Sequence, residues 1–450
     1  MHAFIESILT WQLIISVGVI VVIIHLLLGL AGMSTYGERK VSAYIQDRIG
    51  PNRVGLDLGL PALAFLKGLF GLGQFLADGL KFILKEDYTP RGVDKTLFTL
   101  AASIVIVPAL IAFAIIPWGG GITLPEVHLL GLTIKQQTVV VAGADLSIGI
   151  VYLLAVASLS IYAVVLGGWA SNNKYAFLGG LRASAQMISY EIPLGLSILT
   201  LLLLTGSLMP EKIISYQASN GWLIGALPVV GVVFYICALA EGNRLPFDNA
   251  ECEQELVGGY HTEYSAMRMA LFMLSEYIHL VTASAFFAVL FLGGYHLPLT
   301  WVGAPANHFL SPDFTSDSLL WGIVAVLAKF LVILIKTILM VLFAMLVRWT
   351  IPRLKFNQVM GMAWNGIIPL SIGLVVIAAI MIHYGYTGIK WMLPMNLAVG
   401  ALFLLLAPAS TQSTENKRLR IAGSRFFPLV GEPVIAQPTN PMARHDHPGH

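Results

Sequence analysis

Residues 11–33 read WQLIISVGVIVVIIHLLLGLAGM and contain no Asp, Glu, Lys or Arg. A helix needs about 20 apolar residues to cross the hydrocarbon core of a bilayer, so this stretch is long enough to cross it once. Because lipid offers no hydrogen-bond partners, a crossing segment must be helical. Similar stretches follow at 96–116, 146–167, 190–208, 223–240, 267–292, 319–347 and 365–383, with a shorter one containing Pro394 at 391–409. The sequence predicts an all-α, polytopic transmembrane helix bundle with 8–9 transmembrane helices.

The composition also excludes an ordinary soluble protein. Hydrophobic residues make up 57% of the chain and charged residues 11%, with a mean hydropathy of +0.80. Soluble domains carry about 25% charged residues. The two cysteines, Cys237 and Cys252, are too few for a four-cysteine iron–sulfur cluster or a closed zinc site. We therefore expect no metal site, and no redox cofactor bound by this chain alone.

The distribution of Lys and Arg predicts the orientation in the membrane. Basic residues are enriched on the cytoplasmic side of membrane proteins. Here 21 of the 26 basic residues fall in 34–95, 168–189, 241–266 and 348–364, at Arg268, and in the tail from 410. We expect a periplasmic N-terminus, a single transmembrane domain over 1–409 and a cytoplasmic, largely disordered tail over 410–450. The membrane would be the bacterial cytoplasmic (inner) membrane.

Residues 57–85 are apolar but interspersed with Lys67, Asp78, Lys81 and Lys85. Charges at intervals in an apolar segment are typical of a helix that lies in the membrane interface. We expect one or two amphipathic interfacial helices here, at the inner membrane surface or packed on the bundle.

The predicted inner loop at 241–266 is strongly acidic. A charge run of this kind is usually a solvated loop. This one, however, begins directly at a helix end and includes apolar residues such as Phe247 and Tyr260. Clustered carboxylates in a partly apolar setting have raised pKa values and can hold and pass protons. The carboxylates are Glu241, Asp248, Glu251, Glu253, Glu255 and Glu263, with Arg244 as the one arginine among them.

Three further acids lie within or beside apolar runs: Asp145, Glu191 and Glu276. An acid at membrane depth costs about 2.5–3.5 kcal/mol on insertion scales, which favours a functional role. The alternative is a helix-end acid satisfied by neighbouring backbone or lysine, and for Asp145 both interpretations stay open. Lys329 and Lys336 share one helix face and either pair with these acids or extend toward the interface.

The first predicted inner loop begins at Glu38-Arg39-Lys40 and continues through Gln46 and Arg48 to the turn at Gly50-Pro51-Asn52. Basic groups beside an amphipathic stretch are typical of an anchor for anionic lipid. They are equally compatible with a site for a polar headgroup, and charge counting does not separate the two.

These motifs, in this order, resemble the family of the H subunit of NADH–quinone oxidoreductase, which includes the mitochondrial NADH dehydrogenase subunit one. The resemblance covers about residues 10–385. The residues that carry it are Glu38-Arg39-Lys40, Gln46-x-Arg48-x-Gly50-Pro51-Asn52-Arg53-Val54-Gly55, Gln74-x-x-Ala77-Asp78-Gly79-x-Lys81, Lys85-Glu86, Ser189-Tyr190-Glu191, Ala240-Glu241-x-Asn243-Arg244-x-Pro246-Phe247-Asp248, Glu251-x-Glu253-x-Glu255, Glu263-Tyr264, Arg348-x-x-x-Pro352-Arg353, Gln358 and Trp364.

The chain departs from the family pattern in places. The interval from Gly55 to Gly71 is longer than usual. Asn357, Asn249 and Cys252 stand where the family usually has aspartate, leucine and glycine, so Asn357 is not among the site residues expected here.

The resemblance implies a membrane subunit of a proton-translocating NADH:quinone oxidoreductase (a translocase), with a quinone entrance chamber and quinone as substrate, ubiquinone or menaquinone. NADH, FMN and iron–sulfur clusters would belong to partner subunits: peripheral ones on the inner face, small membrane and antiporter-like ones alongside. Proton coupling would involve Asp145, Glu191, Glu241, Glu251, Glu253, Glu255 and Glu276. Quinone binding would involve Arg39, Gln46, Arg48, Asp78, Arg244, Phe247, Asp248, Glu263, Tyr264 and Arg353.

Two other classes of protein are open on the residues alone. A stand-alone proton-coupled transporter would be built from inverted repeats, and no such repeat is visible. A passive membrane anchor for a soluble partner needs no acids within its helices, and this chain has them.

Overall fold

The computed structural model describes residues 10–55, 68, 70–129, 132–249, 256–298, 310–311 and 319–410. By their contacts the residues form two units, Met1–Phe403 and Leu404–His450. Of the second unit only 404–410, the end of the last helix, are described, so residues 411–450 of the tail expected over 410–450 lie outside the described residues. The site described below belongs to the first unit.

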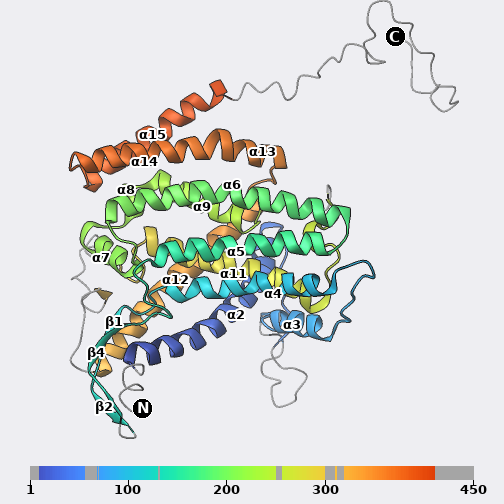
Figure 1. Ribbon diagram of the computed structural model, residues 1–450, viewed down its shortest axis with the longest axis horizontal. Coiled ribbons are helices and arrows are strands. Elements are labelled where there is room, and N and C mark those ends of the chain that lie inside the picture. The colour runs from blue at the N-terminus through green and yellow to red at the C-terminus, as the bar shows by residue number, and fades with distance from the viewer. Residues whose placement is uncertain are drawn as a thin grey trace, which may run out of the picture. The chain divides into compact units, whose positions relative to one another are not determined.

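The predicted helix bundle is confirmed (Figure 1). Among the described residues, seven helices are long and apolar enough to cross a membrane, and α9 and α15 are shorter apolar helices. Each of the nine predicted runs overlaps one of these, although several run past the observed helix ends by a few residues. The principal helices are α2 (Trp11–Ile45), α4 (Lys95–Ala112), α5 (Gly149–Ala170), α6 (Lys174–Thr205), α9 (Pro228–Glu241), α11 (Ala266–Phe291), α12 (Leu319–Thr350), α14 (Ile368–His383) and α15 (Ile389–Ser410).

Shorter elements connect the long helices. They are α3 (Gln74–Leu84), α7 (Pro210–Asn220), α8 (Leu223–Ala226), α13 (Phe356–Gly361), the 3-10 turns η2 (Phe113–Ile115) and η3 (Gly259–His261), and the π-helical turn η6 (Met362–Ile367). α13, η6 and α14 together make one of the seven long spans. Of the predicted amphipathic segment, the described part holds α3, while 56–67 and Leu69 lie outside the described residues.

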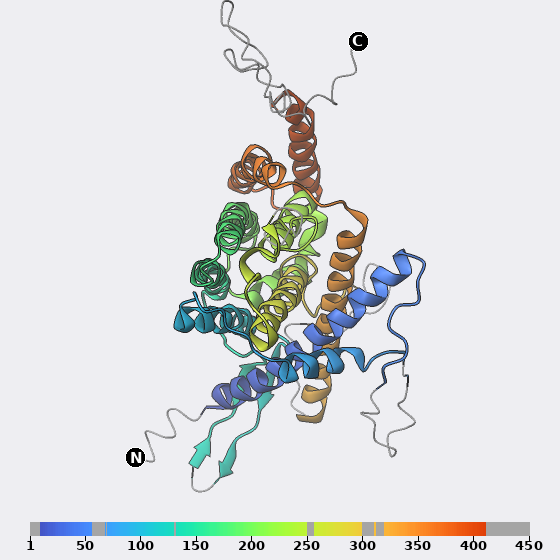
Figure 2. The same cartoon turned by 90° about the vertical axis from the view of Figure 1, so that its right-hand side faces the viewer.

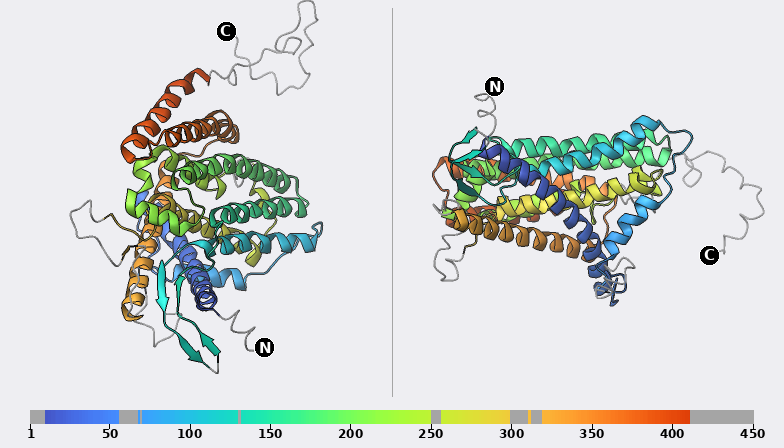
Figure 3. Two further views of the ribbon diagram at one scale, coloured as in Figure 1. Left: turned by 60° about the vertical axis from the view of Figure 1, so that its left-hand side comes forward. Right: turned by 90° about the horizontal axis from the view of Figure 1, so that it is seen from below.

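A small β-hairpin between α4 and α5 was not predicted from the sequence. β1 (Gly121–Leu124) pairs antiparallel with β4 (Gln137–Val140), and β2 (Val127–Leu129) pairs with β3 (Leu132–Ile134). The start of α2 is tied to it, because Trp11 Nε1 donates to the carbonyl of Pro125 at 3.0 Å. The hairpin marks one end of the bundle, called here the hairpin end, and the loop between α9 and α11 marks the opposite, loop end (Figure 3, right). Figure 2 looks along the long helices.

Lys336 binds backbone carbonyls, instead of pairing with an acid or extending toward the membrane interface as expected from the sequence. Its Nζ donates to the backbone carbonyls of Leu292, Gly294 and His296 at 2.6, 2.6 and 2.7 Å. These carbonyls lie at and just beyond the end of α11, where the last helical carbonyls lack intrahelical partners. The ammonium therefore stabilises the C-terminus of α11, where the helix dipole also favours a cation.

Glycines allow the helices at the loop end to approach closely. A Cβ on Gly168 of α5 would lie 2.7 Å from the carbonyl oxygen of Ala176, and one on Gly179 of α6 would lie 2.6 Å from Cα of Gly259. Small residues at helix contacts are how membrane bundles gain packing energy. The contact of Gly179 holds η3, and with it the segment before α11, against α6.

Gly179→Ala is therefore expected to destabilise the protein by about 1–3 kcal/mol, the usual effect of overpacking. Gly195→Ala in the same helix is the matched control, because a Cβ there meets nothing within 4 Å. The measurement is the thermal unfolding midpoint of the detergent-solubilised protein. Equal midpoints for both variants would contradict the close contact.

Candidate functional site

The segment that follows α9 is held inside the bundle at the loop end. Gln186 of α6 donates from Nε2 to the carbonyls of Ala240 and Phe247 at 2.9 and 2.8 Å. Asn243, Arg244 and Asp248 are all buried. The alternative of a solvated loop therefore does not apply to 242–249.

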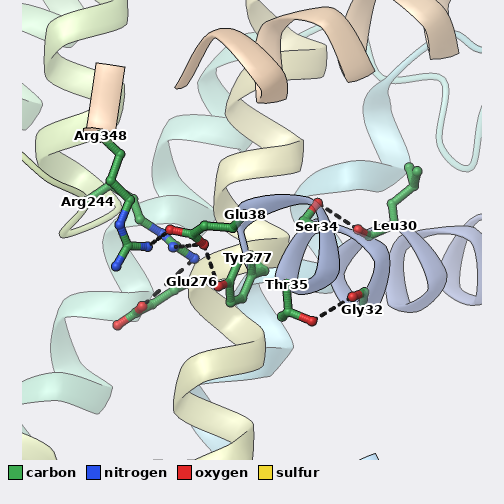
Figure 4. Close-up of polar contacts among 9 residues, drawn as sticks. All are labelled: Leu30, Gly32, Ser34, Thr35, Glu38, Arg244, Glu276, Tyr277 and Arg348. Atoms are coloured by element: carbon green, nitrogen blue, oxygen red, sulfur yellow. Dashed lines mark hydrogen bonds and ion pairs between the residues drawn. The ribbon is translucent and has the colours of Figure 1, made fainter. Parts of the chain in front are cut away.

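Arg244 is the centre of a buried set of charges (Figure 4). Its Nη1 lies 3.4 Å from Oε2 of Glu38, and its Nη2 lies 4.0 Å from Oε2 of Glu276. Its guanidinium stacks over the ring of Tyr277 at 4.0 Å, while the Tyr277 hydroxyl donates to Oε2 of Glu38 at 2.6 Å. Arg348 of α12 forms a close ion pair with the other oxygen of Glu38. We call Glu38, Arg244, Glu276, Tyr277 and Arg348 the Arg244 network.

The Arg244 network joins α2, α11, α12 and the segment after α9. The side chains of Glu38 and Arg244 are only 8% and 7% exposed. Burial lowers the pKa of Arg244, but Glu276, Tyr277 and Glu38 raise it by more, so the net shift is upward and the guanidinium stays charged. Two arginines then balance two glutamates in a poorly solvated place, where each charge requires its partners.

Three members of this network were missed as site residues by the sequence analysis: Glu38, Tyr277 and Arg348. A signal for Glu38 does exist in the sequence. The buried residues of α2 are Ile23, Leu27, Ala31, Ser34 and Glu38, at the three- and four-residue spacing of one helix face. Because the predicted apolar run ended at residue 33, Glu38 was assigned to the loop.

A second ion pair lies beside the Arg244 network. Nη2 of Arg353 is 2.7 Å from Oδ2 of Asp248. Burial raises the pKa of Asp248 to about 6; Arg353 opposes this rise, and Glu276 adds to it. This carboxyl therefore gains and loses its proton near neutral pH more readily than an exposed aspartate.

α3 contacts the end of α2 through a third ion pair. Nη2 of Arg39 lies 2.8 Å from Oδ2 of Asp78, and Gln74 Nε2 donates to the other oxygen of Asp78 at 3.2 Å. The Arg39 side chain is 48% exposed and Asp78 20%, so this pair lies at the surface of the loop end.

A cavity of about 50 Å³ lies between α4, α5, α6, α9 and α11, and Gly242, two residues before Arg244, lines it. Glu241, Gly242, His279 and Thr282 line it, together with the rings of Phe234 and Phe286. Glu191 of α6 is not among the residues that line this cavity, and it accepts a short hydrogen bond from the hydroxyl of Ser158. Of the described acids expected to couple protons, Glu241 is the one that lines the cavity.

The remaining predicted site residues are more scattered. Glu263 accepts from Asn173 at 2.6 Å, and Tyr264 stacks on Phe98 with ring centroids 3.9 Å apart. Gln46 and Arg48 are exposed after α2, and Asp145 is exposed at the hairpin end, away from the other acids. Phe247 is buried against Tyr190, and Glu251, Glu253 and Glu255 lie outside the described residues. The roles expected of all these residues stay predictions.

Within the part of the chain that the structure describes, no group of three or more His, Cys, Asp or Glu side chains is placed to hold a metal ion.

Comparisons with known proteins point to one family. The family model described as NADH dehydrogenase matches residues 17–379. The H subunit of the NADH-quinone oxidoreductase of Flavobacterium psychrophilum is 40% identical over 359 residues, 79% of this chain and 93% of that protein. The H 1 subunit of the same enzyme from Cytophaga hutchinsonii is 41% identical over 76% of this chain and 89% of its own length. The H subunit from Leptospira biflexa is 38% identical over 85% of this chain and 98% of its own length.

Glu38→Gln tests the Arg244 network. It removes the charge that two arginines share, and breaking a buried ion pair costs about 3–5 kcal/mol. We expect a large drop in thermal unfolding midpoint, while the control Glu86→Gln, at an exposed acid of the same end, has none. An unchanged midpoint for Glu38→Gln would mean that the network does not stabilise the fold.

Proposed function

This chain belongs to the NADH dehydrogenase family, and from that membership we propose that it is a membrane subunit of an NADH:quinone oxidoreductase. In that complex it forms the quinone entrance chamber and couples quinone reduction to proton translocation. The observation that carries the proposal is the Arg244 network, because Gly242, two residues before Arg244, lines the same cavity as Glu241.

The entrance is proposed at the contact of α2 with α3. One face of α3 exposes Leu76, Leu80, Ile83 and Leu84, at the spacing of an amphipathic helix. An apolar face of this kind suits lipid and an isoprenoid tail, while the nearby Arg39–Asp78 pair offers polar groups to a headgroup. Asp248 and Arg353 lie further inside the loop end.

The coupling is proposed to be electrostatic. Reduction of a quinone to a quinol takes up two electrons and two protons, so the charge near the headgroup changes during turnover. In a poorly solvated site that change acts strongly on nearby charges. Asp248 responds by taking up a proton, since its pKa is raised to about 6, and the Arg244 network passes the change on to Glu276. Glu241, which lines the cavity, and Glu191 then exchange protons.

The proposal assigns the redox groups to other subunits. NADH, FMN and iron–sulfur clusters would lie in peripheral partners at the loop end, taken as the cytoplasmic side of a bacterial inner membrane. Small membrane subunits and antiporter-like subunits would contact the helices laterally. Exposed apolar residues along α12, such as Leu327, Leu331 and Leu339, suit such contacts or lipid.

Glu241→Gln tests the coupling. Removing a group that transfers protons typically lowers rates by about 10²–10⁴-fold. We expect quinone-linked turnover and proton pumping to fall accordingly, with electron transfer to a water-soluble artificial acceptor kept. The control is Glu126→Gln on the exposed hairpin. Equal loss of both activities in fully assembled complex would indicate a structural role.

Arg39 tests the entrance. Arg39→Ala leaves Asp78 without its arginine, and we expect a raised KM for quinone with assembly retained. Arg39→Lys should restore activity only in part, because an ammonium lacks the planar fork of a guanidinium. If Arg39 only anchors anionic lipid, lysine serves equally well. Full rescue by lysine, measured at matched assembly, would therefore contradict the entrance assignment.

A further inference from the structure

His279 is a partly buried histidine without an assigned role, and its Nε2 is shielded from solvent. It lies in α11, and its side chain lines the cavity that Glu241 also lines. Its Nε2 has no hydrogen-bond partner among the described residues. A histidine that only fills a core normally has its ring nitrogens paired, because buried polar atoms nearly always are.

The cavity beside His279 is large enough to hold water. A water molecule needs roughly 10–15 Å³ of cavity volume, so about 50 Å³ has room for about three to five. The wall is largely apolar, but Glu241, His279 and Thr282 border it and offer polar groups. Water in this space would reach Glu241 and the part of the His279 ring that faces the cavity, whereas Nε2 itself has almost no accessible surface.

His279 also lies next to the Arg244 network along its own helix. Glu276 and His279 are three residues apart on α11, which places them on one face in successive turns. Glu276 belongs to the Arg244 network and accepts from the Tyr260 hydroxyl at 3.3 Å. His279 is thus a cavity-lining residue that lies three residues from a member of the network on the same helix.

The other end of the cavity is apolar. Phe234 and Phe286 line it toward the hairpin end, and behind them the rings of Phe287 and Phe291 lie 6.0 and 5.5 Å from that of Phe234. Water in the cavity is therefore bounded by aromatic rings on that side and by titratable groups on the other.

We propose that His279 is a proton-relay residue, which carries a proton between Glu276 and Glu241 through water in this cavity. The inference rests on the proposed function and adds a group to it. An O–H bond at the Glu276 carboxyl breaks and an N–H bond forms on the imidazole. The imidazolium then loses a proton to water, which delivers it to the Glu241 carboxylate. His279 ends neutral, and one proton has moved.

Two variants, His279→Gln and His279→Phe, distinguish proton transfer by this side chain from its polar contact with water. Glutamine keeps a polar contact for water but does not titrate, and phenylalanine removes both. We expect each variant to lower quinone-linked turnover and proton pumping at least tenfold. The KM for quinone and electron transfer to a water-soluble acceptor should stay at wild-type values. The control is His25→Gln, since His25 is exposed on α2 and its Nδ1 contacts only its own helix, at the carbonyl of Val21.

Each outcome of these measurements supports or overturns the proposed relay. Wild-type turnover in His279→Gln with loss in His279→Phe would mean that the side chain only holds water, and would overturn the relay. Full activity in both variants would overturn it as well. If Glu241→Gln is inactive while His279→Gln is fully active, the relay fails and the proposed function stands. If Glu241→Gln is fully active, the proposed function itself fails.

A measurement on the wild-type complex tests the relay even if a His279 variant fails to assemble. Time-resolved infrared spectra recorded during quinone reduction, with ¹⁵N-labelled histidine, should contain a transient imidazolium band. That band should be absent from His279→Gln and present in His25→Gln. Its absence from the wild-type spectrum would contradict the relay.

Discussion

Glu38 carries its charge on a membrane-spanning helix with almost no access to solvent, where an isolated carboxylate is strongly disfavoured. It is tolerated because Arg244, Arg348 and the hydroxyl of Tyr277 surround it. Those groups come from three segments distant in sequence. The ionised carboxylate therefore requires α11, α12 and the segment after α9 to meet at α2. This constraint shapes the whole loop end of the bundle.

The same requirement explains why a strongly charged loop folds inward. Arg244 reaches Glu38 only if the chain turns back directly after α9, and Gln186 and the close contact of Gly179 with Gly259 hold it in that position. Burial then changes the chemistry of the loop: Asp248, which lies beside the network, has its pKa raised to about 6. The burial of this segment thus accounts both for its position in the fold and for the raised pKa of Asp248.

The long helices were predictable because hydropathy is local: about 20 apolar residues in a row are sufficient evidence of a membrane-spanning segment. The site was predictable only in part. The sequence identified Arg244, Glu276, Arg39 and Asp78, but not that Glu38 belongs with Arg244, a pairing across 206 residues. Nor did it predict that Lys336 binds backbone carbonyls or that strands as short as β2 form. These depend on long-range packing, which no local pattern encodes.

α11 has a particular position in this arrangement. It carries Glu276 and Tyr277 in the Arg244 network and His279 in the cavity within one turn, and Lys336 holds its far end through three carbonyls. A helix fixed at its C-terminus and bound by charges near its middle moves little as a whole. In the coupling proposed above, a change of charge at the loop end would be expressed as a change in protonation and hydrogen bonding along α11. In a closely packed bundle, this response costs less free energy than a movement of the helix, because no backbone is displaced.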